Sequence, residues 1–583
     1  MRRLFAILLA AAMLFMLCSC GSAAAGTASA PEVSAAEDNT AATAQEAAEA
    51  PASETPAEAA GPAEEASAVE EASAEEAAPA EEPAPDLEEA YETMYPIQEE
   101  GVSLTFMINL GGFVFQFMEN GDLNQTIAAQ IQEEETGIHI EYQGVDQDAY
   151  SDRFSLMVAS EDYTDMCATP EMLYPGGIDG LIDDEVMVNI NDYLDVMPHF
   201  AAFGQEHPEF IKSMTSDSGN LVSIWNYVPD TDYCVMYRQD LLEQVGLDIP
   251  ETYDELHEVL TAFKNETDVK TPLEVGRNGT SNCAWMGGYD CAISSDEEFG
   301  WLVDDDGNVV CSTVSDNMRD FLTLWSQWYA EGLMTKDFIS QESNTRDPII
   351  TGSCGATYNM MTCVSDSERE AYGISMVCAP DVTINKGDII HTGINEHPTN
   401  KGSGSIGITT ACEYPEVAAK WLNWFFTEKG TVTYNFGVQG ETYDIDADGN
   451  YYYTDAIINN ELGLPAMLAT SMLIGWPAMS FPRMEERTTA FYTNDDERGM
   501  MDLWYSNRDN AHVYFGDLTA EESSAYSATA SDILTYASEN ISGFIMGARP
   551  MSEWDSFVQT CYDMGIQDLI DLKQAAYDRY LER

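Results

Sequence analysis

The chain has 583 residues and carries 102 acidic against 24 basic side chains, which gives a formal net charge of −78. A chain of this length exceeds what one hydrophobic core supports, so two or more domains are expected. A surface this acidic repels phosphate groups, which excludes nucleic acid and polyphosphates as expected ligands and disfavours small anions.

The first twenty residues have the features of an export signal. Arg2 and Arg3 precede an apolar run, residues 4–17, which has the length of a signal-peptide core and is too short to span a bilayer. The run ends in Leu-Cys-Ser-Cys, which resembles the bacterial lipobox, and Cys20 would then carry the lipid. An ordinary signal peptide with a chance cysteine is the alternative. No later segment has enough uninterrupted apolar residues to predict a membrane span.

Residues 21–100 are rich in Ala, Glu, Pro and Ser, with 21 acidic residues and no Lys or Arg. Such a segment cannot bury enough apolar area to offset the entropy lost on ordering, so we expect it to be disordered. We interpret it as a tether between the lipid and the folded part. An acidic interaction tail is the alternative.

Strands and helices alternate in the next part of the chain, a pattern typical of parallel β/α units. The predicted strands are 102–108, 138–142 and 165–168, and the predicted helices between them are 123–135 and 149–159.

Helix boundaries are marked clearly further along. A strand is predicted at 233–237, and Gly246 follows the predicted helix 240–245 in the position of a helix-ending glycine. Capping boxes are predicted at Thr252 with Glu255 and at Thr519 with Glu522. An amphipathic helix is predicted at 416–426, and the C-terminal part is expected to be helical up to Tyr580.

Ten of the 12 cysteines follow residue 20, and no two of them form a Cys-x-x-Cys pair. Zinc ribbons and thioredoxin-like redox sites therefore have no support. Export would permit disulfides, but free buried thiols fit equally well, and no pairing follows from the sequence.

The segment 235–256 resembles a signature of the extracellular solute-binding proteins that serve carbohydrate importers: tyrosine, a basic residue, aspartate-leucine, glycine, then proline-x-threonine-aromatic-aspartate-glutamate-leucine. Residues 416–426 resemble a helix of the same family, and residues 435–443 and 541–554 resemble its LipO-like lipoprotein subgroup. The likeness extends from about residue 101 to residue 583.

This resemblance implies an α/β fold of the two-lobed, class II-like periplasmic-binding-protein type, with a hinge of several crossing segments. It places residues 101–228 and 404–440 in the N-lobe, and residues 229–403 and 441–583 in the C-lobe. It also implies a non-enzymatic protein at the extracellular face of the cell membrane. This protein would deliver a ligand, expected to be an oligosaccharide, to the permease subunits of an ABC importer. A binder of peptides or other solutes, a sensor subunit and a surface glycan hydrolase are the alternatives.

A sugar site needs aromatic platforms with polar groups around them. The aromatic candidates stand at predicted strand ends or in loops, and they are Trp225, Tyr227, Trp285, Tyr289, Tyr358 and Trp476. Asp165 and Glu171 are candidates for polar groups at the rim of the site. Each aromatic residue taken alone is also compatible with ordinary core packing.

The segment 444–455 fits the oxygen-ligand spacing of an EF-hand calcium loop, with Asp444, Asp446, Asp448, Asn450 and Asp455 as ligands. A β-hairpin with an Asp-Gly turn is the alternative, and the tyrosines at 451–453 favour it. The segment 264–272, where some LipO-like proteins bind calcium, lacks the ligand spacing. No cofactor is otherwise expected, and neither a P-loop nor a common hydrolase motif occurs, so no catalytic residue is predicted.

Overall fold

The computed structural model divides the chain into two compact units, and all described residues belong to the unit Glu82–Arg583. The described residues are 86–99, 101–110, 122–227, 233–276, 285–291, 299–304, 306–340, 348–349, 351–360, 369, 372–390, 405–458, 482–491 and 515–583. Cys20 and Trp476 lie outside them. Within these ranges, no helix has both the length and the apolar character needed to cross a membrane.

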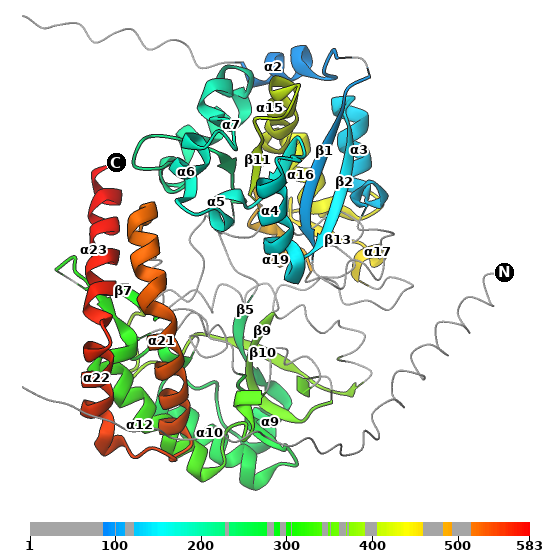
Figure 1. Ribbon diagram of the computed structural model, residues 1–583. Helices are drawn as coiled ribbons and strands as arrows, with labels where there is room; N and C mark the ends of the chain where they lie inside the picture. Colours follow the sequence, from blue (N-terminus) through cyan, green and yellow to red (C-terminus); the bar gives the residue numbers. More distant parts are fainter. Residues whose placement is uncertain are drawn as a thin grey trace, which may run out of the picture. The chain divides into compact units, whose positions relative to one another are not determined.

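The first sheet has the strand order β2-β1-β3-β11-β4. Strands β1, β2 and β11 of this sheet are labelled in Figure 1. Strands β1 (Ser103–Leu110), β2 (His139–Asp146) and β3 (Met166–Ala168) are parallel, as the alternation of strands and helices predicted. Strand β11 (Ile406–Ile408) pairs antiparallel with both β3 and β4 (Ser223–Ile224).

The helices that accompany this sheet surround one large core, which includes buried Phe106, Met166, Trp225, Trp421 and Trp424. The two crossovers of the parallel strands are α3 (Ile127–Thr136), preceded by η3 (Leu123–Gln125), and α4 (Gln147–Ser160). The other elements are α5 (Pro170–Leu173), α6 (Gly177–Asp183), η4 (Ile190–Val196), α7 (Pro198–Glu206), α8 (Pro208–Met214), α15 (Pro415–Asn423), η8 (Trp424–Phe426) and α16 (Glu428–Phe436).

The second sheet has the order β10-β5-β9-β6 and belongs to a second large core. Strands β6 (Thr271–Leu273), β9 (Cys354–Met360) and β10 (Met376–Ala379) run in one direction, and β5 (Tyr233–Arg238) runs against β9 and β10. The helices and short elements around this core are α9 (Gln239–Val245), α10 (Tyr253–Glu266), η5 (Ser312–Val314), α12 (Asp316–Glu331), η6 (Phe338–Ser340), α21 (Ala520–Ile545), η10 (Met551–Glu553), α22 (Trp554–Asp563) and α23 (Ile566–Glu582), together with the hairpin of β7 (Trp301–Val303) and β8 (Val309–Cys311).

The residues predicted to begin or end helices lie at the observed helix ends. Gly246 ends α9 in the left-handed conformation, with φ 73°. Thr519 and Glu522 form a complete capping box at the start of α21. At α10 the box is incomplete: Thr252 accepts from the Glu255 amide, but the Glu255 carboxylate accepts from the amide of Glu251.

A third, smaller cluster forms around Phe436 and the hairpin of β12 (Tyr443–Ile445) and β13 (Tyr451–Tyr453). The short helices α17 (Asp455–Ile458) and α19 (Glu486–Thr489) complete it.

The structure corrects the end of the predicted tether at residue 100. Helix α2 (Leu87–Met94) lies within that segment, and Tyr95 and Ile97 after it are buried in the first core. The Tyr95 hydroxyl donates to the backbone oxygen of Lys420 at 2.8 Å. Ordered structure therefore begins before residue 101, because Tyr95 and Ile97 are buried in the first core.

Candidate ligand-binding site

Three strands of the first sheet present polar residues at one edge. Strand β3 ends at Ala168 and leads to Glu171, β4 ends at Ile224 before Trp225, and antiparallel β11 begins just after Ser405. This is the edge where the parallel strands have their carboxyl ends. Ligands of open α/β sheets bind outside this edge.

The backbone after β3 is strained at this edge. Thr169 adopts the left-handed conformation with φ 47°, which is rare for a β-branched residue. The residue is buried, and its amide donates to the backbone oxygen of Ser405 at 3.0 Å. Such strain persists only where surrounding contacts enforce it, and it is concentrated at functional sites.

Glu171 is the centre of a buried polar network. Its side chain is almost fully buried, and its two carboxylate oxygens accept from Ser405 Oγ at 2.8 Å and from Ser223 Oγ at 2.9 Å. The indole Nε1 of Trp225 donates to Ser223 Oγ at 3.2 Å. The adjacent Asn226 is 7% exposed, and its Oδ1 has no hydrogen-bond partner within the described part of the chain. Such an oxygen can accept a hydrogen bond from a ligand hydroxyl.

Tyr227 extends this edge with an aromatic group. Its ring lies 4.6 Å from the ring of His207, 5.1 Å from Phe203 and 5.4 Å from Phe210, measured between centroids. Tyr227 is only partly buried. Burial raises the pKa of its hydroxyl, so the group is a neutral hydrogen-bond donor at physiological pH.

Several segments that are distant in the sequence meet beside Tyr227. The backbone amide of Arg483 donates to the backbone oxygen of Tyr227 at 2.8 Å. Asn435 donates to the Pro482 oxygen at 2.9 Å and accepts from the Met484 amide at 3.0 Å. These contacts fasten the first core to the small third cluster next to the edge.

The second sheet has an equivalent edge. Glu274 directly follows β6, and a single residue separates Asp381 from the end of β10. Both side chains are buried. Because β5 runs against these strands, its first residue, Tyr233, lies at the same edge. Six Cα–Cα steps join Tyr227 to Tyr233, and a peptide chain of that length spans at most about 22 Å. The two edges are therefore near each other.

The structure separates the aromatic candidates into two groups. Trp225, Trp285 and Tyr358 are fully or almost fully buried within the cores, so none presents an open ring face to a ligand. Tyr227 and Tyr289 are partly exposed. The Tyr289 ring packs 4.8 Å from that of Tyr253. A platform role remains a prediction for these two residues.

Asp165 and Glu171 are equal rim candidates in the sequence, but they lie at opposite ends of β3. Asp165 precedes the strand, and its Oδ2 accepts from both the amide and the hydroxyl of Thr105 at 2.7 Å. It therefore braces β1 against β3 at the edge away from Glu171.

The segment predicted as a possible calcium loop forms a hairpin. Asp446 Oδ1 accepts from the amides of Asp448 and Asn450 at 2.9 Å, and Tyr443 pairs with Tyr453 across the strands. Asp455 begins α17. Among the described residues, no group of three or more His, Cys, Asp or Glu side chains is arranged to hold a metal ion. The Asp-Gly turn explains the spacing, since Gly449 has φ 94°.

Comparison with known proteins agrees with this architecture. Residues 126–442 match the model of the bacterial extracellular solute-binding proteins. The chain belongs to this family. It is 23% identical over 504 residues to the fructooligosaccharide ABC transporter substrate-binding protein FusA of Streptococcus pneumoniae, covering 79% of this chain and 88% of FusA. It is 25% identical over 338 residues to lipoprotein LipO of Bacillus subtilis, covering 54% and 63%.

Solved structures of other solute-binding proteins share the fold. FusA in complex with kestose has a TM-score of 0.64 at 18% identity, covering 82% of this chain and 100% of the FusA chain in that structure. The alginate-binding protein AlgQ2 has a TM-score of 0.63 at 21% identity, covering 82% and 98%. The two-lobed α/β fold implied by the sequence signature is thus confirmed.

Ser223, Asn226, Ser405, Glu274 and Asp381 were not predicted from the sequence. Ser223 lies in β4, and the other four lie within two residues of the end of a short strand. In the sequence, the position of these residues relative to the strands was the signal for the site, and the presence of aromatic residues was not.

Proposed function

We propose that this family member is a lipid-anchored protein that captures an oligosaccharide outside the cell and delivers it to the permease subunits of an ABC importer. The observation that carries the proposal is the polar network around Glu171 at the carboxyl edge of a family-typical sheet. Carboxylate, amide and serine groups beside a partly exposed tyrosine match the hydroxyl edges and apolar faces of sugar rings.

The relatives support the same ligand class. FusA is described as binding fructooligosaccharides, and its structure was solved with kestose. These proteins share less than a quarter of their residues with this chain, so they support the class of solute and leave the particular sugar open.

The proposed working parts follow the sequence interpretation. The lobes are residues 101–228 with 404–440 and residues 229–403 with 441–583, and they close on the ligand by a hinge motion. The two large cores support this division for residues 95–225 with 406–434 and for residues 234–382 with 530–569, whereas Tyr443, Tyr453 and Ile457 pack around Phe436 in the third cluster. Cys20 holds the protein at the outer face of the membrane, consistent with the similarity to LipO.

Thermal unfolding of the full chain with a panel of solutes tests the proposal. Kestose, raffinose and maltotriose represent neutral oligosaccharides, and trialanine represents peptides. Binding at one hundred times Kd stabilises the native state by about 2.7 kcal/mol, which is readily measured. Stabilisation by trialanine alone would refute the carbohydrate assignment, and release of smaller sugars from a bound one would identify a hydrolase.

The site is tested with Glu171→Gln, and Asp192→Asn on the exposed face of η4 is the matched control. Glu171→Gln removes a charge-assisted hydrogen bond, either to the ligand or to Ser223 and Ser405, which orient the Glu171 side chain. We expect this loss to lower ligand affinity about tenfold or more. Unchanged affinity in Glu171→Gln would remove this residue from the site. A permease gene next to the gene for this chain would separate an importer from a sensor subunit.

A further inference from the structure

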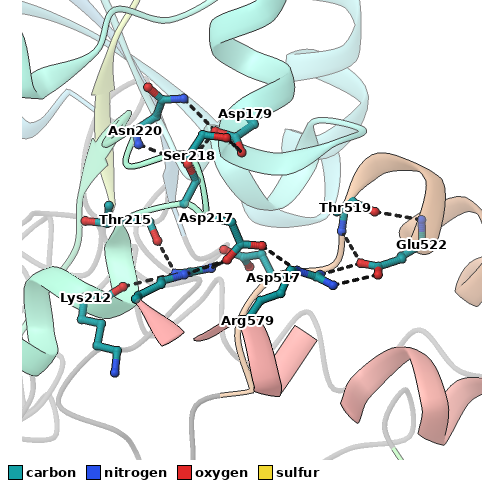
Figure 2. A network of polar contacts seen from close by, with 12 residues as sticks. Asp179, Lys212, Thr215, Asp217, Ser218, Asn220, Asp517, Thr519, Glu522 and Arg579 are labelled. Carbon is teal, nitrogen blue, oxygen red and sulfur yellow. Dashed lines mark hydrogen bonds and ion pairs between the residues drawn. The ribbon is translucent and has the colours of Figure 1, made fainter. Parts of the chain in front are cut away.

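The last turn of the chain connects the two large cores at a place separate from the segments that join the lobes. Helix α23 belongs to the second core through buried Ile566 and Leu569. Its last turn carries Arg579, which contacts the segment after α8 of the first core (Figure 2), and Arg583 directly after the helix contacts the same segment.

Arg579 binds one carboxylate attached to the first core and one attached to the second core. Its Nη1 and Nη2 donate to the two oxygens of Glu522 at 2.9 and 2.6 Å, and its Nε donates to Asp217 Oδ2 at 2.7 Å. Glu522 belongs to α21 of the second core, whereas Asp217 belongs to the loop after α8. Bidentate pairs of this kind are the strongest and most directional ion pairs in proteins.

Arg583 binds the other oxygen of Asp217 and caps the C-terminus of helix α8. Its Nε donates to Asp217 Oδ1 at 2.8 Å, and its Nη1 donates to the backbone oxygens of Lys212 and Thr215. Those oxygens lie at the C-terminus of α8, where helix carbonyl groups lack partners within the helix and favour a cation. The Arg583 side chain is only 10% exposed.

The loop that carries Asp217 is fixed to the first core. Asp179 of α6 accepts from Asn220 Nδ2 at 2.7 Å and from Ser218 Oγ at 2.9 Å (Figure 2). It also accepts from Ser216 Oγ at 2.5 Å. These three bonds enclose Asp217 on both sides. These bonds hold the loop to α6, so we expect a displacement of α23 to strain or break the contacts that Asp217 makes with Arg579 and Arg583.

We propose that Asp217, Glu522, Arg579 and Arg583 form an ionic clasp that biases the lobes toward the conformation in which α8 and α23 touch. Residues 101–583 carry 81 acidic against 22 basic side chains, so the two lobes repel each other, and two arginines placed between carboxylates offset that repulsion locally. Because the lobes move about a hinge, a contact outside the crossing segments shifts the conformational equilibrium without touching the ligand.

Single-molecule energy transfer on the full chain tests the clasp. Dyes placed through non-canonical amino acids at exposed Gln130 of α3 and Glu258 of α10 report one lobe each. In the double variant Arg579→Gln, Arg583→Gln, we expect a broader or shifted distance distribution at low salt. The wild type should move toward the same distribution as salt rises from about 0.05 to about 1 M, because salt screens partly exposed ion pairs. The variant should respond less.

Arg549→Gln is the matched control, because Arg549 pairs with Glu553 and Asn540 within the second core. It should leave the distribution as in the wild type. Asp217→Asn changes only the loop carboxylate and leaves α23 intact, so it separates loss of the clasp from misfolding of the last helix. Wild-type distributions with wild-type salt response in both the double variant and Asp217→Asn would overturn the proposal. Ligand binding is not part of this measurement, so its outcome is independent of the proposed function.

Discussion

Asn423, the last residue of α15, supplies a helix cap from a distant part of the chain. Helix α7 begins at Pro198, and its own N-cap residue, Met197, makes no side-chain cap. Asn423 Oδ1 accepts instead from the amides of His199 at 2.9 Å and Phe200 at 3.1 Å. Its Nδ2 donates to the Tyr95 hydroxyl and contacts His199 Nδ1, both at 3.1 Å.

Substitution Asn423→Ala would leave two buried amides at the start of α7 without a partner. A buried donor that loses its partner costs about 1–3 kcal/mol, so two amides cost about 2–6 kcal/mol. Tyr95 keeps its bond to the Lys420 oxygen and adds little. We expect the free energy of unfolding to fall by about 4 kcal/mol. Asn423→Asp keeps an acceptor oxygen for both amides and should cost less.

Guanidinium unfolding followed by tryptophan fluorescence measures this loss, since Trp421 and Trp424 lie in the same core as Asn423. Asn191→Ala is the control, because exposed Asn191 makes a single bond to the Gly219 oxygen, and a change within about 0.5 kcal/mol is expected there. A loss below about 1 kcal/mol in Asn423→Ala, or a similar loss in both variants, would show that α7 does not depend on this cap.

Three further outcomes follow from local geometry. Gly430→Ala should destabilise the protein by about 1–3 kcal/mol in the same unfolding assay, because the added Cβ would lie 1.9 Å from the Trp424 oxygen; Gly543→Ala, whose nearest neighbour would lie 3.5 Å away, should be neutral or stabilising. Thr252→Ala should cost about 1 kcal/mol by removing the cap of α10, and no loss would show that the cap is dispensable. Burial lowers the pKa of His199 below its ordinary value of 6.5, so the folded protein favours the neutral ring. The stability that comes from this preference is fully present above pH 6.5 and is lost as the pH falls through the lowered pKa. Acidification from pH 7.5 to 5 should therefore destabilise the wild type more than His199→Gln, and equal losses would contradict this.

Local signals in the sequence were sufficient for much of the first lobe. Periodic apolar residues and Gly137, which ends α3 with φ 74°, predict the parallel β/α units. The short strand β4 gave no such signal. It has only two residues, and the antiparallel pairing between positions 224 and 406 is a long-range event that periodicity cannot reveal.

The tether boundary was missed because composition was averaged over the whole segment. Tyr91 and Tyr95 are the only aromatic residues between positions 21 and 100. Tyr91 donates to Glu135 at 2.6 Å, and Tyr95 is buried. A window confined to residues 87–97 would have separated this apolar, helix-forming stretch from the acidic repeats before it.

The ligand site shows why strand direction carries more information than residue type. Trp225 and Trp285 were candidates because they are aromatic residues at predicted strand ends or in loops, yet their large apolar area favours burial in the cores, where neither exposes a ring face. Asp165 and Glu171 are both carboxylates adjoining β3, and only the direction of the strand distinguishes them. The residue before a parallel strand lies at the edge that faces away from ligands, and the residue after it lies at the edge where ligands bind. The same rule, applied to β6 and β10, selects Glu274 and Asp381 from a chain with 102 acidic residues, a choice that charge alone could not make.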